Sequence, residues 1–172
     1  MVGYHKRSDP ATMWAKEEID RLKQSDKLKY VRITMPAGDW IAGGFDDLLK
    51  SDEKVPDLPR DVAEGWDSPH FKFVNYYIHQ VNLLRHLLGE SYRVTHATEV
   101  LLVAASVSGV TGTIELSPFT TSLGWQESAL VGFEKNCVKL ELPAPLVINQ
   151  PGRVDVLSEK GTFSPQLPPV LP

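Results

Sequence analysis

The chain has 172 residues, of which 42% are hydrophobic and 23% are charged, with a formal net charge of −4 at pH 7. These values are typical of one globular domain that buries roughly 70% of its unfolded surface, and the acidic balance argues against a nucleic-acid partner. No apolar run is long enough for a membrane span, the N-terminus lacks the apolar segment of a signal peptide, and the single cysteine, Cys137, fits a reducing compartment, so we expect a cytoplasmic protein without a membrane partner.

The first third of the chain predicts a helix, a strand and a long irregular segment. Ser8 or Asp9 as cap, with Pro10 in the first turn, predicts a helix from about Ala11 to Gln24. Alternating apolar and polar residues over Lys29–Met35 predict a strand. Residues 36–68 are interrupted by proline and glycine, and two interpretations stay open for them: a binding element, or an irregular surface segment held by its aromatic side chains.

The stretch from Pro69 to Gly89 predicts a long helix that organises the domain. Pro69 is suited to a helix start and Gly89 to a helix end. Apolar residues recur between them at helical spacing, which predicts one face in the core: Phe71, Val74, Ile78, Val81, Leu84 and Leu88.

A polar stripe follows another face of the same helix, formed by Asn75, His79, Asn82 and His86. Residues at these spacings lie about 5–6 Å apart, so we expect the chemistry of this protein along the stripe. The alternative for His79 is a hydrogen-bonded core histidine. His79 and His86 are two turns apart, too far for one ion, and we predict no metal site.

The second half of the chain changes to β-structure. We predict strand segments over 93–107, 110–116, 128–133, 137–142 and 154–158, followed by an extended, poorly anchored tail over 162–172. The order predicts an α+β fold with an open-faced, largely antiparallel sheet and helices packed on one face. Leu101 to Ala105 have no polar side, and strands of that kind are buried on both faces. We therefore predict a homo-oligomer through the sheet face.

Three segments carry a family resemblance. NYYIHQVNLLRHLLGE is similar to a motif of the glucose–fructose oxidoreductase and inositol dehydrogenase (Gfo/Idh/MocA) family, in which an acidic residue and a histidine four residues later lead into a leucine-rich helix ending in glycine. VGYHKRSDPA resembles the segment that leaves the nucleotide-binding domain of that family, and ESALVGFEKNCVKLELP resembles its strand–turn–strand. The resemblance runs from Val2 to about Lys160.

The resemblance implies a two-domain enzyme, of which this chain matches the second domain. The first domain would be a Rossmann fold that binds NAD or NADP; the second shapes the pocket for a sugar or polyol-like alcohol and oligomerises. The sequence has no G-x-G-x-x-G and no Glu-Lys-Pro, which Glu53–Lys54–Val55 only approximates. We therefore expect residues 1–10 to be a remnant of the nucleotide-binding domain, with Met1 an added start, 11–161 the α+β domain, 162–172 a proline-rich tail, and no cofactor bound by this chain.

The resemblance also assigns roles to residues. His79 would exchange a proton with a substrate hydroxyl, which contributes about 10²–10⁴ in rate. Asn75 stands where the family has aspartate, and an amide orients the imidazole without supplying charge. Lys6 and His5 would face the substrate, although Lys6 and Arg7 also fit a solvated basic pair.

Three functions remain open. The leading one is the substrate-binding and oligomerisation domain of an NAD(P)-dependent oxidoreductase, inactive as an isolated domain. Asn75 and the missing catalytic lysine favour a non-enzymatic assembly or ligand-binding module on the same scaffold. A lyase or isomerase that uses His79 alone has little support.

Overall fold

The computed structural model describes residues 5–36, 52–54, 56–57, 59–60, 69–117, 125–144 and 150–168. The chain divides into two compact units, Met1–Ala37 with His79–Pro172, and Gly38–Ile78. The predictions for the irregular segment 36–68 fall largely outside the described residues. Within the described parts of the chain, no helix combines the length and apolar composition that a membrane crossing requires.

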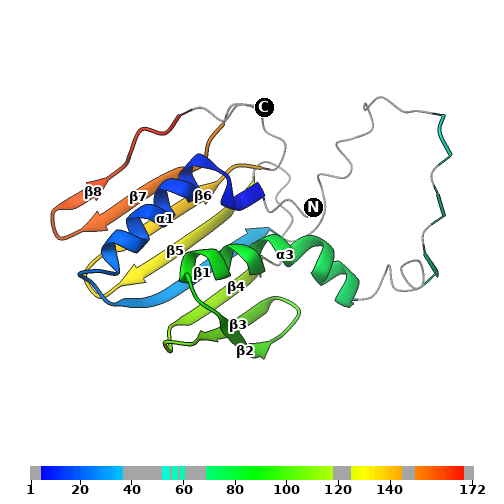
Figure 1. Cartoon of the computed structure of the whole chain (residues 1–172), viewed down its shortest axis with the longest axis horizontal. Helices are drawn as coiled ribbons and strands as arrows, with labels where there is room; N and C mark the ends of the chain where they lie inside the picture. The colour runs from blue at the N-terminus through cyan, green and yellow to red at the C-terminus, as the bar shows by residue number, and fades with distance from the viewer. Residues whose placement is uncertain are drawn as a thin grey trace. The chain divides into compact units, whose positions relative to one another are not determined.

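The first unit is built on one eight-stranded sheet (Figure 1). Its strands lie in the order β2-β3-β4-β1-β5-β6-β7-β8. Only β1 and β4 pair in parallel, and every other neighbouring pair is antiparallel. The predicted α+β fold with a largely antiparallel sheet is confirmed. The strands are β1 Leu28–Pro36, β2 Tyr92–Ala97, β3 Leu101–Ser106, β4 Thr111–Ser117, β5 Glu127–Phe133, β6 Cys137–Leu142, β7 Arg153–Ser158 and β8 Gly161–Phe163.

The helix α1 (Pro10–Leu22) begins and packs as its sequence requires. The Asp9 carboxylate caps it by accepting a hydrogen bond from the Ala11 N–H at 2.8 Å. The same carboxylate accepts from the Gly152 N–H at 3.2 Å, so the cap also holds the segment before β7. The helix lies over β6 and β7 with small and branched apolar side chains facing the sheet: Ala11, Ala15, Ile19 and Leu22.

The helix α3 (Pro69–Leu88) ends where the sequence predicts. Gly89 has φ +74°, a conformation that favours glycine after a helix, and Lys23 Nζ donates to the Leu88 carbonyl at 2.7 Å. Leu84 packs directly on Gly112 of β4, where a Cβ would lie 2.9 Å from Leu84 Cδ1. Over the part of α3 whose burial is described, the sheet-facing side chains are Gln80, Leu83, Leu84, Leu87 and Leu88.

The predicted apolar face of α3 was therefore only partly right. Leu84 and Leu88 are buried, but Ile78 and Val81 are only half-buried. Because Leu83 and Leu87 also face the sheet, the buried stripe is turned away from the predicted one and includes the polar residue Gln80.

The two ends of the chain hold structure that the sequence did not predict. His5–Arg7 forms a short 3-10 helix, η1. Gly161–Phe163 pairs with β7 as the edge strand β8, so the prediction of a poorly anchored tail was wrong for its first residues. The Phe163 ring lies 6.1 Å from the Trp14 ring on α1, which anchors β8 to the helix layer.

The sheet has one covered face and one open face. Figure 1 shows α1 and α3 lying across the same face. The covered side of β1 carries Val31, Ile33 and Met35 in the core, as its alternation predicts. On β3, Leu102 and Ala104 are buried whereas Leu101, Val103 and Ala105, which alternate with them, are half-buried on the open face.

Candidate functional site

A carboxylate lies in the core at the start of β5. Glu127 leads the alternating series Glu127, Ala129, Val131, Phe133, all on the covered face of the strand. Glu127 is only 2% exposed. A buried charge is costly unless it is paired and hydrogen-bonded, so its partners decide what this site is.

Three side chains satisfy the Glu127 carboxylate. Lys6 of η1 forms an ion pair with Oε2, and Lys6 is itself only 5% exposed. Trp125 donates from Nε1 to the same oxygen at 3.0 Å, and Gln80 of α3 donates from Nε2 to Oε1 at 2.7 Å. Lys6 Nζ also lies 5.3 Å from the centre of the Trp125 ring, within range of a cation–π contact. We call these four residues the Glu127 cluster.

The Glu127 cluster joins three parts of the fold. Lys6 comes from the N-terminal turn, Gln80 from α3, and Glu127 from the central region of the sheet. Its one carboxylate and one ammonium balance in charge, which is the condition under which buried ions are tolerated. In the described part of the chain, Gln80 Oε1 has no hydrogen-bond partner, so the Gln80 amide is held through its nitrogen.

His79 adjoins this cluster as the residue before Gln80 on α3. Its side chain is half-buried. Burial lowers the pKa of the His79 imidazole from the ordinary 6.5, the positive charge of Lys6 lowers that pKa further, and the negative charge of Glu127 opposes the change. Its surroundings therefore favour the neutral imidazole, the form that can accept a proton.

The lowered pKa predicts how stability depends on pH. His86 also has its pKa lowered by burial, and next by the charge of Arg7. Between the lowered pKa of each histidine and 6.5, the unfolded chain binds more protons than the folded chain, so stability rises with pH. We expect the free energy of unfolding to be constant above about pH 7.5 for these groups and to fall as the pH drops below 6.5.

This contribution is measured by urea unfolding at a series of pH values. The native chain is compared with a double variant that carries both His79→Gln and His86→Gln. The double variant should lose less stability between pH 7 and pH 5.5 than the native chain. An equal loss in both would contradict the prediction.

The structure brings some of the predicted site residues together. Lys6 and His79 share the surroundings of Glu127, and the alternative of a solvated Lys6 was wrong, although Arg7 is exposed. His5 lies in η1 and Asn75 in α3, but their side chains are outside the described residues. The roles of His79, Asn75, Lys6 and His5 remain predictions.

Sequence reasoning missed Gln80, Trp125 and Glu127. One signal was present for Glu127: it lies at the spacing of two that also places Ala129 and Val131 on the core face. A carboxylate at a core-facing position requires a buried cation, and the predicted strand began one residue too late to include it.

Metal binding is a separate question. Among the residues that the structure describes, no three histidine, cysteine, aspartate or glutamate side chains are grouped so that they could hold a metal ion. His86 is influenced by Arg7, Lys16 and Asp20 and so lies toward α1, whereas His79 is influenced by Lys6 and Glu127. The two histidines have different surroundings.

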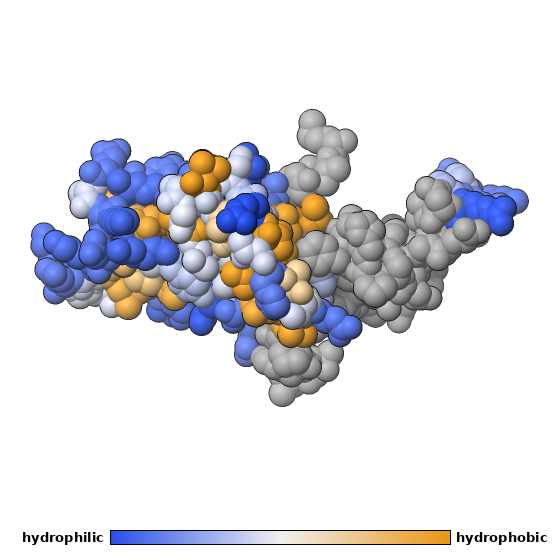
Figure 2. All heavy atoms as spheres, turned by 90° about the horizontal axis from the view of Figure 1, so that it is seen from below, coloured by the Kyte–Doolittle hydropathy of each residue, from blue (hydrophilic) through white to orange (hydrophobic). Residues whose placement is uncertain are grey.

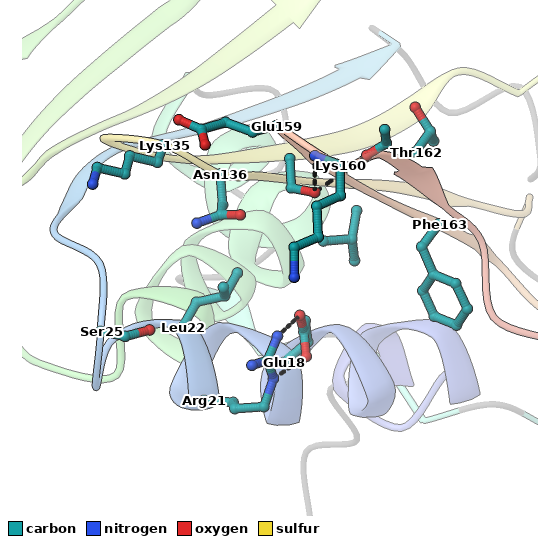
Figure 3. Close-up of a pocket in the computed structure, with 13 residues that line it drawn as sticks. Glu18, Arg21, Leu22, Ser25, Lys135, Asn136, Glu159, Lys160, Thr162 and Phe163 are labelled. Carbon is teal, nitrogen blue, oxygen red and sulfur yellow. Dashed lines mark hydrogen bonds and ion pairs between the residues drawn. The ribbon is translucent and has the colours of Figure 1, made fainter.

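A hollow of about 530 Å³ lies elsewhere in the unit, between the end of α1 and the β7–β8 hairpin (Figure 3). Arg21 and Glu18 on its helix side are ion-paired at 2.6 Å, and Figure 3 shows Lys160 extending toward Glu18. Neither His79 nor any member of the Glu127 cluster lines it. We therefore place the candidate site at the Glu127 cluster and not in this hollow.

No protein-family model matches the sequence, and no curated protein matches it either. Solved structures do match. A protein from Desulfitobacterium hafniense assigned as an NADPH-dependent oxidoreductase superposes with a TM-score of 0.68 at 15% identity, over 99% of this chain and 50% of its own. Levoglucosan dehydrogenase in complex with NADH and levoglucosan gives 0.58 at 14% identity, over 96% of this chain and 46% of its own. The fold is shared with oxidoreductases.

An oxidoreductase from Agrobacterium radiobacter in complex with NAD+, L-tartaric acid and magnesium has the same fold, with a TM-score of 0.59 at 13% identity. The match includes 100% of this chain and 47% of the Agrobacterium protein. The matched structures are described as oxidoreductases or dehydrogenases, and the shared fold agrees with the α+β domain that the sequence resemblance implies. The chain spans about half the length of the solved structures that it matches.

Proposed function

We propose that this chain is the substrate-binding and oligomerisation domain of an NAD(P)-dependent oxidoreductase that acts on a sugar or polyol-like alcohol. The observation that carries the proposal is a half-buried histidine beside a buried Lys–Glu pair, on a fold shared with oxidoreductases. One of these structures holds levoglucosan, a sugar derivative, together with NADH. The nucleotide-binding half would come from a Rossmann domain outside this sequence.

The chemistry proposed for His79 follows from its protonation state. Oxidation of an alcohol removes a hydride from carbon and a proton from the hydroxyl. NAD or NADP, bound by the complete protein, would take the hydride. The neutral imidazole of His79 would accept the proton, a role that contributes about 10²–10⁴ in rate. His5 and Asn75 would orient the substrate and the imidazole, whereas the buried, ion-paired Lys6 acts on His79 through its charge.

The test is an assay of the complete protein. If the reading frame continues upstream into a glycine-rich βαβ unit and a Glu-Lys-Pro, the full-length protein should reduce NAD+ or NADP+ with levoglucosan, sorbitol or myo-inositol. The 172-residue chain alone is the control and should give no turnover. The absence of turnover with every polyol and both nucleotides would overturn the proposal.

A second candidate is a non-enzymatic assembly or ligand-binding module on the same scaffold. Asn75 favours it, because an amide supplies no charge to the imidazole one helical turn away. In that case the chain should still bind a polyol, seen as shifts of its histidine resonances in NMR spectra, while no reading frame supplies a nucleotide-binding domain.

We also propose that the oligomer forms through the open face of the sheet. That face carries half-buried apolar side chains from β3 and β5: Leu101, Val103, Ala105 and Leu130. The β2 edge is a poorer candidate, because Arg93 is exposed along it and an exposed charge opposes edge pairing. Figure 2 looks at the molecule from this edge and shows apolar patches separated by polar side chains.

Sedimentation of the 172-residue chain tests this interface. We expect a dimer or larger assembly, and Val103→Glu should shift it toward the monomer because a carboxylate would be buried between the two sheets. Val94→Glu, at an exposed position on the β2 edge, is the matched control and should leave the assembly unchanged. A monomeric native chain would contradict the proposal.

A further inference from the structure

Glu127 contacts every other member of its cluster. Each of its carboxylate oxygens has its own partners: Oε1 accepts from Gln80, and Oε2 contacts Lys6 and Trp125. Removing Glu127 would therefore take a partner from Gln80, Lys6 and Trp125 at once.

We infer that Glu127 is a positioning residue for His79. Glu127 acts in two ways: it holds the amide of Gln80, the next residue on α3, and together with Lys6 it sets the electrostatic surroundings of the His79 imidazole. The inference rests on the proposed function, in which His79 moves the proton. It adds a residue from β5 to a mechanism that the sequence motifs confined to α3 and the N-terminal segment.

The mechanical part of this inference follows from burial. Gln80 is 1% exposed and Glu127 is 2% exposed, and their hydrogen bond of 2.7 Å joins two elements that are each fixed by the core. Among the described residues, Gln80 has no second side-chain hydrogen bond. The bond therefore fixes the turn of α3 that carries both Gln80 and His79.

The electrostatic part follows from the two charges of the cluster. Among the described residues, the charged groups that act on His79 are Lys6 from η1 and Glu127 from β5. Lys6 disfavours the imidazolium and Glu127 favours it, with Lys6 the stronger of the two. Burial is the main cause of the lowered pKa of His79, and the pair adds a smaller change in the same direction because the effect of Lys6 exceeds that of Glu127.

Two isosteric substitutions separate this role from a structural one. Lys6→Met and Glu127→Gln break the same ion pair, so a structural role predicts similar effects from both. A positioning role predicts opposite effects on His79. Glu127→Gln should lower the pKa of His79 further, because Lys6 then acts alone, and Lys6→Met should raise it. The measurement is the titration of the His79 resonance in the 172-residue chain labelled with ¹³C-histidine, assigned by comparison with His79→Gln.

Glu141→Gln is the matched control, because it removes a carboxylate from an exposed ion pair with Lys139 on β6. It should leave the His79 titration unchanged. If either single variant fails to fold, Lys6→Met with Glu127→Gln removes both charges, and His79 should then titrate above its native value because the stronger influence of Lys6 is gone.

Shifts of the same sign in the two single variants, or a His79 titration that no folded variant changes, would overturn the inference. The titration needs neither substrate nor nucleotide. A complete protein without dehydrogenase activity would therefore remove the proposed function and leave the coupling of Glu127 to His79 as a separate result.

Discussion

Glu127→Ala should destabilise the chain by about 3–5 kcal/mol, because it leaves the Lys6 ammonium buried without a counter-ion. Lys6 is only 5% exposed, so water does not replace the lost carboxylate in this structure. Gln80 Nε2 and Trp125 Nε1 also lose their acceptor. Since domains of this size are stable by about 5–15 kcal/mol, the variant should still fold, and urea unfolding followed by circular dichroism measures the difference.

Two comparisons make that prediction specific to the buried charge. Glu141→Ala breaks the exposed ion pair with Lys139 and should cost at most about 1 kcal/mol. Lys6→Met with Glu127→Leu replaces both ions by apolar groups of similar size and should recover the part of the loss that comes from the unpaired Lys6 charge, but not the part that comes from the Gln80 and Trp125 donors. A loss below about 1 kcal/mol for Glu127→Ala would show that water reaches Lys6 in solution.

The sequence predicted those helices and strands whose own residues carry a full signal, such as alternating apolar residues or a glycine at the helix end. Val31, Ile33 and Met35 alternate with polar residues, and all three are buried on β1. The end of α3 was predictable because Gly89 adopts the positive φ that follows many helices. β8 has three residues and is held by pairing with β7 and by the contact of Phe163 with Trp14, so no repeat within its own sequence could reveal it.

Residue spacing alone predicted the candidate site only where it lies on one helix, and Lys6 was added by the family resemblance. His79 stands out because it shares a helical stripe with other polar residues. Gln80 was hidden because the predicted apolar face contained Ile78 and Val81, whereas the buried face is turned toward Gln80 and Leu83. Glu127 and Gln80 are 47 residues apart in the sequence, and tertiary pairing over that distance leaves no periodic signal. The burial of Lys6 depends on Glu127 and was hidden for the same reason.

His79→Ala in the complete protein should lower turnover by about 10²–10⁴, the usual contribution of a general base, while changing stability by no more than about 1–2 kcal/mol because the side chain is only half-buried. The loss should be smallest at high pH, where hydroxide can replace the imidazole as the proton acceptor. Steady-state rates of nicotinamide reduction over a pH series, with a saturating polyol, measure the effect.

His86→Ala is the matched control for that experiment. His86 lies on the same polar stripe, is half-buried, and has its pKa lowered by burial like His79, but its charged neighbours are Arg7, Lys16 and Asp20 rather than the Glu127 cluster. It should lose a similar amount of stability and keep its turnover. If His86→Ala lowers turnover as much as His79→Ala, the effect belongs to the packing of α3; if neither variant lowers it, the proton passes to another group and His79 has no part in the chemistry.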